Sequence, residues 1–330
     1  MRDMIDFVIT WVDDTDPVWL FDRGRYCGIP AVSGDCRFRD WGLLQYWFRG
    51  VEKFAPWVNK VHFVTYGHLP EWLNTDHPKI NIVKHADYIP KEYLPTFNSH
   101  TIELNLHRIP DLAEQFVYFN DDMFLLNSVT PEDFFENGLP KETFSLDTLR
   151  FDSRSIAFID SNNIALINDR FDKKQFIKQN FRKIFTPVIG RNKFIKNLFL
   201  APFPYLTGFF NHHIACSYLR KSFETAWELY PEQLDATCRC RLRQRTNVNQ
   251  WLIKDLQFVH GWFENRSNSF GARINLHKKN INECCCRIRE QKYKILCVND
   301  NEGVKEFEEM KKRLHDAFAD ILPEKSSYER

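Results

Sequence analysis

The sequence predicts an α/β protein in which helices cover a mostly parallel, Rossmann-like sheet. Two observations support this prediction. Short apolar runs of strand length alternate with helical patterns through roughly the first third of the chain. In addition, two of these runs, Ile5–Val12 and Phe116–Asn120, end directly in acidic residues. Polar residues at the carboxyl ends of strands are typical of sheets that bind a ligand at that edge.

The individual elements follow from periodicity. Ile5–Val12 is a continuous apolar run, as expected for a strand buried on both faces. Arg39–Phe54 has a helical period through Leu43, Trp47 and Val51. The other expected strands are Val61–Thr65, Ile80–Val83 and Phe116–Asn120. The other expected helices are Glu103–Ile109, Ile214–Glu228, Val248–Val259 and the amphipathic Val304–Ile321.

The composition excludes several classes of protein. The 45 basic and 44 acidic residues leave a net charge of +1, and no long Lys/Arg stripe indicates a nucleic-acid partner. There is no signal-like segment and no uncharged apolar run of about 18 residues, so we expect a cytoplasmic protein. The nine cysteines lack the paired spacing of zinc sites, and we expect free thiols.

Residues 170–200 interleave cations with phenylalanines. Asp172 is the one acid between the first and the last of nine cations, which are Arg170, Lys173, Lys174, Lys178, Arg182, Lys183, Arg191, Lys193 and Lys196. This combination suits peripheral contact with an anionic surface at the inner face of the membrane. A helical hairpin that packs its phenylalanines on the core and turns its lysines to water is the alternative.

Asp121 and Asp122 form the strongest local signal, because they follow the Phe116–Asn120 strand. Adjacent carboxylates repel each other unless a cation or a donor network neutralises them. A divalent metal that bridges a diphosphate would do so. A turn or a helix N-cap built from aspartate is the alternative.

Three further groups are candidates. Asp13, Asp14 and Asp16 close the first strand, where carboxylates accept hydrogen bonds from a ribose or a base; an Asp-Pro turn is the alternative. His212 and His213 precede an expected helix, and a histidine there is either a general base or a structural hydrogen-bonding group. The Arg241–Arg243 segment supplies cations that suit phosphate, although surface arginines are common.

Taken together, these segments resemble the Stealth family of sugar-1-phosphate transferases. The family acts in bacterial capsule and cell-surface polysaccharide synthesis, and it includes animal N-acetylglucosamine-1-phosphotransferase. Four blocks match in order: IDFVITWVDDTDP from Ile5; RFRDWGLLQYWFRGVEKFAPWVNKVHFVT from Arg37, through to FVYFNDDMFL; a block from His213 to RLRQRTNVNQ; and CVND from Cys297. The chain departs from the family pattern at Ala215, where a proline is usual, and at Asn247, where an aspartate is usual.

The resemblance implies an organisation and a set of site residues. Residues 1–150 would form a GT-A-like nucleotide-sugar-binding core, residues 151–210 a variable basic insertion, and residues 211–330 a helical part that completes one catalytic unit. The implied catalytic residues are Asp122, His213 and Arg243. The implied ligands of Mg²⁺ or Mn²⁺ are Asp121, Asp122 and Asp300. The implied substrate-binding residues are Asp13, Asp14, Asp16, Arg39, Asp40, Asn98, Ser99, Glu103, His107, Arg108, Asn120 and Asn299.

The implied reaction transfers a hexose 1-phosphate, such as N-acetylglucosamine 1-phosphate, from a UDP-sugar to a hydroxyl of a glycan or lipid-linked saccharide. UMP leaves, and either Asp122 or His213 takes the hydroxyl proton. Two alternatives remain. A conventional metal-dependent glycosyltransferase would release UDP instead, and a non-catalytic partner in a polysaccharide assembly complex would release neither.

Overall fold

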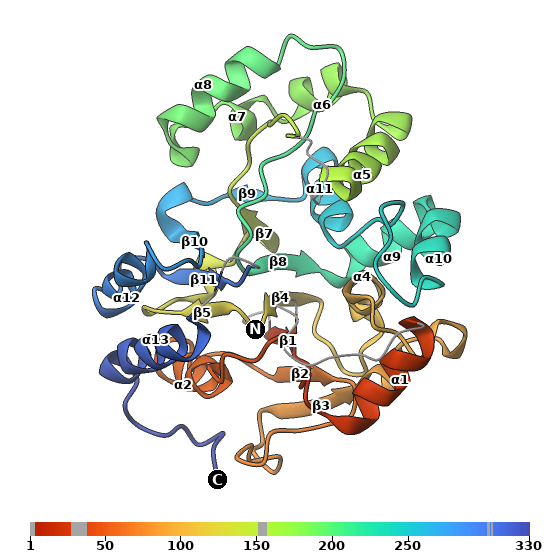
Figure 1. The fold of residues 1–330 in the computed structure, drawn as a ribbon. Helices are drawn as coiled ribbons and strands as arrows, with labels where there is room; N and C mark the ends of the chain where they lie inside the picture. Colours follow the sequence, from red (N-terminus) through yellow and green to blue (C-terminus); the bar gives the residue numbers. More distant parts are fainter. Residues whose placement is uncertain (1–3, 28–37, 151–156, 302–303, 305) are drawn as a thin grey trace.

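The computed structural model describes residues 4–27, 38–150, 157–301, 304 and 306–330. Its centre is a five-stranded sheet with the order β3-β2-β1-β4-β8 (Figure 1). The strands β3, β2, β1 and β4 are mutually parallel, and β8 runs antiparallel to β4. The prediction of an α/β protein with a mostly parallel sheet is therefore confirmed. The strands of this sheet are β1 (Ile5–Thr10), β2 (Val61–Thr65), β3 (Ile80–Lys84), β4 (Gln115–Asn120) and β8 (Cys216–Leu219).

Side chains of the central strands alternate between two hydrophobic cores. On β1, Phe7 and Ile9 belong to the core that includes residues of α2 (Leu44–Phe54) and α13 (Phe307–Ile321). Val8 belongs to the opposite core, with residues of α9 (Arg220–Leu229) and α11 (Trp251–Val259). Because both faces are covered, the sequence of β1 is apolar apart from Asp6 and the terminal Thr10.

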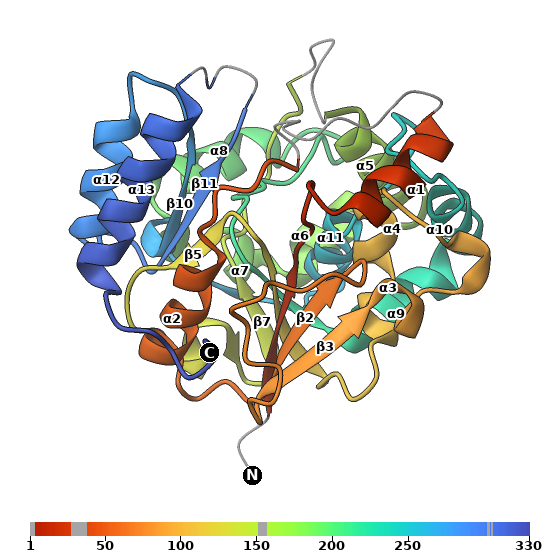
Figure 2. The same cartoon turned by 60° about the horizontal axis from the view of Figure 1, so that its bottom comes forward.

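A second sheet, β10-β11-β5, begins where β4 ends. The chain leaves β4 at Asn120 and enters β5 (Met123–Leu125) after two residues. β5 pairs antiparallel with β11 (Ile295–Asn299), which pairs parallel with β10 (Gly271–Asn275). Figure 2 shows α12 (Ile281–Arg289) and α13 beside this sheet.

A third, small sheet contains β6 (Phe135–Glu136), β7 (Leu139–Glu142) and β9 (Glu264–Asn265). All three sheets combine strands from residues 1–150 with strands from residues 211–330. The predicted segments therefore interleave in space. The remaining α-helices are α1 (Pro17–Cys27), α3 (His85–Tyr88), α4 (Ser99–Leu104), α5 (Ala157–Arg170), α6 (Lys173–Gln179), α7 (Phe181–Ile184), α8 (Arg191–Leu200) and α10 (Pro231–Cys238).

Several element predictions were wrong at one end. The predicted helix Ile214–Glu228 begins instead with β8, because Cys216–Leu219 completes the sheet along β4 and a short apolar run does not distinguish strand from helix. The helix predicted from Arg39 starts at Leu44, after Gly42 takes a positive φ of 66°. Glu103–Ile109 is divided between α4 and a 3₁₀ turn, Leu106–Arg108.

Two further helices, α11 and α13, also begin later than expected. The helix predicted from Val248 starts at Trp251, whose backbone N–H donates to the Asn249 side chain at 3.2 Å. The helix predicted from Val304 starts at Phe307. Helix termini are the least certain part of a pattern-based prediction, since caps rather than periodicity set them.

The basic segment, residues 170–200, folds as three short α-helices, α6 to α8, rather than as a hairpin. Phe176 is buried in the core, whereas Phe199 is exposed. Lys173 is buried, and Lys183 donates to the backbone carbonyls of Gly261 and Phe263. Part of the segment is therefore packed as the hairpin alternative expected. Among the described residues, no helix is both long enough and apolar enough to cross a bilayer.

A buried carboxylate joins the loops at the amino ends of the central strands. Asp6 Oδ2 lies 3.0 Å from His62 Nε2 and accepts from the backbone N–H of Ala113 at 2.8 Å. Asp6 Oδ1 accepts from the Asn59 amide at 2.7 Å. Burial alone would raise the pKa of Asp6, but the hydrogen bonds from His62, Asn59 and Ala113 lower it overall.

We expect Asp6→Ala to lower the free energy of unfolding by about 3 to 5 kcal/mol, because it leaves buried donors without an acceptor. Urea denaturation measures this loss. Asp76→Ala, at an exposed position, is the control and should stay within about 0.5 kcal/mol of the wild type. Because the folded pKa of Asp6 is lowered, its contribution is present above the unfolded pKa and is lost as the pH falls through the folded pKa. If the difference in unfolding free energy between the wild type and Asp6→Ala grew as the pH fell, this assignment would be contradicted.

Candidate active site

A cavity of about 330 Å³ lies beyond the carboxyl ends of β1 and β4. The strand order reverses its direction at β1, between β2 and β4, and open α/β sheets bind their ligands at such a switch point. Thr10 and Trp11 line the cavity from the β1 side, and Asn120, Asp121 and Asp122 line it from the β4 side.

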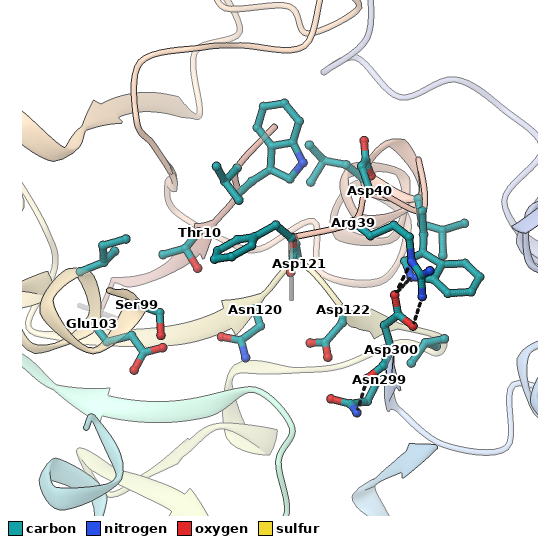
Figure 3. Close-up of a pocket in the computed structure, with 18 of the residues that line it drawn as sticks. Thr10, Arg39, Asp40, Ser99, Glu103, Asn120, Asp121, Asp122, Asn299 and Asp300 are labelled. Carbon is teal, nitrogen blue, oxygen red and sulfur yellow. Dashed lines mark hydrogen bonds and ion pairs between the residues drawn. The ribbon is translucent and has the colours of Figure 1, made fainter. Parts of the chain in front are cut away.

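Many of the predicted site residues meet in this cavity. Figure 3 shows Ser99 and Glu103 on α4 at one side of Asn120, with Arg39 and Asp300 beyond Asp122 at the other side. Segments that are distant in the sequence therefore share one site. The predicted residues that line it are Arg39, Asp40, Ser99, Glu103, Asn120, Asp121, Asp122, His213, Arg243, Asn299 and Asp300.

The predicted donor-site acids after β1 do not line the cavity. Asp16 Oδ1 accepts from the backbone N–H of Trp19 at 2.7 Å at the start of α1. Asp13 Oδ1 accepts from the backbone N–H and the hydroxyl of Thr15. Asp14 is buried. Asp13 and Asp16 thus make the turn and capping contacts that the Asp-Pro alternative expected.

Three more predicted residues lie outside the cavity lining. Asn98 is buried and caps α4, and its Nδ2 donates to Asn247 Oδ1 at 3.0 Å. His107 stacks on Phe223, and the Arg108 guanidinium lies over Trp227. His107 and Arg108 do not extend α4, because the chain passes into the 3₁₀ turn after Asn105 and turns them toward α9.

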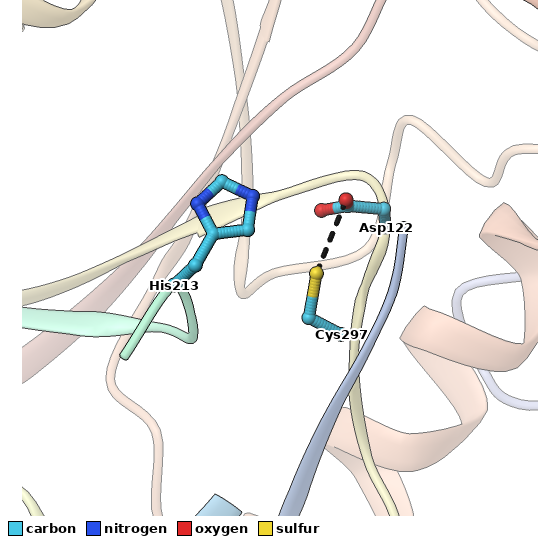
Figure 4. A group of neighbouring side chains, drawn as sticks. All are labelled: Asp122, His213 and Cys297. Carbon is cyan, nitrogen blue, oxygen red and sulfur yellow. Dashed lines mark hydrogen bonds between the residues drawn. The ribbon is translucent and has the colours of Figure 1, made fainter. Parts of the chain in front are cut away.

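The acidic pair occupies the connection between two sheets. The Asp122 carbonyl accepts from the Val298 backbone N–H at 2.8 Å, which fixes the turn against the β11 strand. Its Oδ2 accepts from the Cys297 thiol at 3.2 Å. Burial raises the pKa of the Cys297 thiol, so the thiol keeps the proton that it donates. Figure 4 shows that the His213 ring also faces this carboxylate, and one ligand atom from each of the three residues lies within 4.8 Å of the others.

The charge of this pair fits a divalent cation. Asp122 Oδ1 is buried and has no hydrogen-bond partner among the described residues. The pKa of Asp121 is raised to about 7, because surrounding protein desolvates it and Asp122 and Asp40 repel its charge, although the residue as a whole is exposed and lines the cavity. Mg²⁺ and Mn²⁺ prefer oxygen ligands to sulfur, so Asp121 and Asp122 fit these ions, and the Cys297 thiol fits a positioning role.

Asp300 was predicted as a metal ligand, but in this structure its carboxylate binds the Arg39 guanidinium. Its Oδ1 accepts from Arg39 Nη2 at 2.7 Å and from the Asn301 backbone N–H, and its Oδ2 accepts from Arg39 Nε and from Trp41 Nε1. A carboxylate offers about four acceptor positions, and these contacts use them. In this arrangement Asp300 has no oxygen left for a cation and instead holds Arg39 at the rim.

The opposite wall combines a buried acid with a cation. Arg243 Nη2 donates to the Ser99 hydroxyl at 2.6 Å. The pKa of Glu103 is raised to about 7 by burial, while Arg243, Ser99 and Tyr118 partly oppose the rise. Near neutral pH, Glu103 therefore exists in both protonation states beside a permanent cation.

His213, rather than His212, lines the cavity. It takes an unusual φ of 51°, and its ring meets Trp251 edge to face. Burial lowers the pKa of His213, although Asp122 opposes this, so the imidazole is neutral at pH 7. Burial lowers the pKa of His212 to about 3, and its ring lies against Phe210.

The sequence interpretation missed several residues of the site. Cys297, expected to be a free thiol, donates to the Asp122 carboxylate, although it is not among the residues that line the cavity. The aromatic residues Trp11, Trp19 and Phe97 line the cavity. The position of Trp11 directly after β1 was a usable signal, because aromatic rings at strand ends commonly line ligand sites.

Comparison with known proteins gives consistent matches. Residues 37–143 match the family model described as Stealth protein CR2, conserved region 2. The capsular polysaccharide phosphotransferase WcwK of Streptococcus pneumoniae is 41% identical over 99% of this chain and 98% of its own length. The exopolysaccharide phosphotransferase cps2G of Lactiplantibacillus plantarum is 38% identical over 99% and 96%. The solved galactosyltransferase LgtC matches 93% of this chain and 95% of its own with 12% identity and a TM-score of 0.37.

We expect the buried Glu103 to make folding less favourable as the pH rises. Its folded pKa of about 7 exceeds the unfolded value of 4.5, so the folded state binds more protons between these values. Stability should therefore fall across this window in the wild type and fall less in Glu103→Gln. Urea denaturation at pH 5 and pH 7.5 tests this difference, with the exposed Glu71→Gln as control. Equal slopes for all three proteins would show that Glu103 is ionised throughout.

Proposed function

The chain belongs to the Stealth family of sugar-phosphate transferases, and we propose that it transfers a hexose 1-phosphate from a UDP-sugar to a sugar hydroxyl. N-acetylglucosamine 1-phosphate is an example of the transferred group, and UMP is the leaving group. The observation that supports the proposal is the convergence of Asp121, Asp122, His213 and Arg243 on one cavity at the switch point of the sheet. The product belongs to the synthesis of a cell-surface polysaccharide, as the names of the relatives suggest.

The reaction forms one bond and breaks one. An acceptor hydroxyl oxygen attacks the β-phosphorus, and the bond from this phosphorus to the oxygen that it shares with the α-phosphorus breaks. The UMP oxygen takes the electron pair, and the sugar phosphate becomes a phosphodiester. Such reactions need positioning and charge neutralisation more than covalent help from the protein.

His213 suits the role of the base that takes the hydroxyl proton. Burial keeps the pKa of His213 low, so that its imidazole is neutral and has a free lone pair at pH 7. The carboxylate of Asp122 beside it would stabilise the imidazolium that forms. Asp122 remains the alternative base.

Arg243 and the acidic pair suit the two sides of a diphosphate. Arg243 is a permanent cation held at the cavity wall by Ser99, and its planar fork matches phosphoryl oxygens. Asp121 and Asp122 would hold Mg²⁺ or Mn²⁺, and such an ion would neutralise the charge of the phosphates and of the departing UMP. The acceptor hydroxyl belongs to a glycan or a lipid-linked saccharide.

The identity of the released nucleotide tests the proposal. The purified protein, incubated with a panel of nucleotide-sugars, a short glycan acceptor and Mg²⁺ or Mn²⁺, should release UMP from one UDP-sugar. Release of UDP would contradict the proposal and support the conventional glycosyltransferase. No nucleotide release from any donor, with a range of acceptors, would favour the non-catalytic assembly partner.

We expect Asp122→Asn to lower the transfer rate on the order of 10²-fold or more, because it keeps the shape but removes a charge. The same variant should bind Mn²⁺ more weakly, as measured by electron paramagnetic resonance. Asp76→Asn is the exposed control and should match the wild type in both measurements. Near-normal turnover of Asp122→Asn would exclude the assigned role, and full wild-type activity in EDTA would exclude the metal.

A further inference from the structure

The outward face of α8 is apolar, although the core of the protein does not use it. Ile195, Leu198 and Phe199 are spaced three and four residues apart and therefore share one face of the helix. Leu198 is 51% exposed and Phe199 is 74% exposed. Exposed apolar stripes of this kind mark surfaces that bind something else.

A buried polar side chain fixes the orientation of this helix. Asn197, on the inner face of α8, is fully buried. Its Oδ1 accepts from the Leu146 backbone N–H at 2.8 Å and from the Ser145 hydroxyl at 3.2 Å, and its Nδ2 donates to the Ile184 carbonyl at 2.7 Å. Rotating the helix to bury its apolar stripe would break these bonds inside the protein, which is costly. The stripe is therefore held toward solvent.

The apolar surface continues into the loop after α8. Phe203 is 53% exposed and Tyr205 is 69% exposed. The buried ammonium of Lys173 donates to the Leu200 carbonyl at 2.7 Å and to the Tyr205 carbonyl at 3.0 Å, so both ends of the loop are tied down. Figure 1 shows α6, α7 and α8 together at the end of the molecule opposite the C-terminus.

The surroundings of this surface are cationic. Residues 173–223 contain no aspartate or glutamate. Lys174, Lys178, Arg182 and Arg191 are exposed and form no ion pair with another described residue. Two other cations of the segment are paired, Lys196 with Asp147 at 2.8 Å and Lys183 with Glu264 at 3.1 Å. An anionic partner would therefore complement the charge that the segment leaves unpaired.

We propose that Ile195, Leu198, Phe199, Phe203 and Tyr205 form a docking face for an anionic lipid membrane. The apolar side chains enter the headgroup region, and the neighbouring lysines and arginines contact anionic headgroups. A second copy of the chain suits the face poorly, because a two-fold symmetric contact would bring the same cations together. The docking does not depend on the chemistry proposed above.

The docking face is also close in sequence to a residue that lines the cavity. His213 follows Tyr205 by eight residues, and Figure 1 shows the chain descending from α8 to β8 through this stretch. Docking would bring a membrane-carried acceptor to the side of the molecule that supplies His213. This last link alone rests on the proposed function.

Vesicle co-sedimentation tests the docking face. The full chain should sediment with vesicles of phosphatidylglycerol and phosphatidylcholine at low salt, and much less with phosphatidylcholine alone or at high salt. The double variant Phe199→Ser, Phe203→Ser should bind at least about tenfold more weakly, because it has less apolar area to bury in the headgroup region of the membrane. The control Phe21→Ser removes an equally exposed ring from α1 and should bind like the wild type.

A charge variant tests the same surface without touching its apolar residues. Replacing Lys174, Lys178 and Arg182 by Gln should weaken binding at low salt by at least about tenfold. Replacing the exposed Lys91, Lys279 and Lys292 by Gln changes the net charge equally and should have little effect. Lys173 and Lys183 stay unchanged, because both bond to backbone carbonyls inside the fold.

Three results would overturn the proposal. The wild type could fail to bind anionic vesicles, or the docking-face variants could bind as well as their matched controls. The third result is self-association in sedimentation velocity that Phe199→Ser, Phe203→Ser abolishes, which would assign the face to a second copy.

Discussion

The turn from β4 to β5 is the constraint on which the site depends. The chain leaves the five-stranded sheet and joins the second sheet within Asp121 and Asp122. The hydrogen bond from the Val298 N–H to the Asp122 carbonyl fixes this turn against β11. The turn thereby holds two carboxylates side by side at the switch point of the sheet, although their charges repel each other. In the proposed function, a divalent cation bound by this pair would relieve the repulsion.

The cavity walls are held by contacts between segments that are far apart in sequence. Asn98 joins the start of α4 to the loop that carries Arg243, through Asn247 and the Cys240 carbonyl. At the other rim, Asp300 holds Arg39 and Trp41. Asn98, predicted as a ligand contact, and Asp300, predicted as a metal ligand, therefore hold other parts of the cavity wall in position. Such support keeps reacting groups in position, which phosphoryl transfer requires.

Local patterns predicted much of the sheet and the acidic pair. The strands β1, β2 and β4 are buried on both faces, so their sequences are mostly apolar and can be recognised without tertiary information. β8 could not be predicted in this way, because Cys216–Leu219 becomes a strand only by pairing with β4. The same limit applies to Asp300, since its partner Arg39 is 261 residues away. Asp13 and Asp16 differ from Asp300, because their partners are neighbours in sequence, and the Asp-Pro turn expected from the sequence accounts for these contacts.

Whether phosphorus moves with the sugar can be followed with a label in the β-phosphate of the UDP-sugar. A phosphodiester product carries the β-phosphorus, whereas glycosyl transfer leaves it on the nucleotide. With a radiolabelled β-phosphate, a soluble glycan acceptor and the wild-type protein, we expect the label to appear in the glycan and to resist phosphatase. Label that stays entirely with the released nucleotide, while the sugar moves to the acceptor, would contradict this expectation.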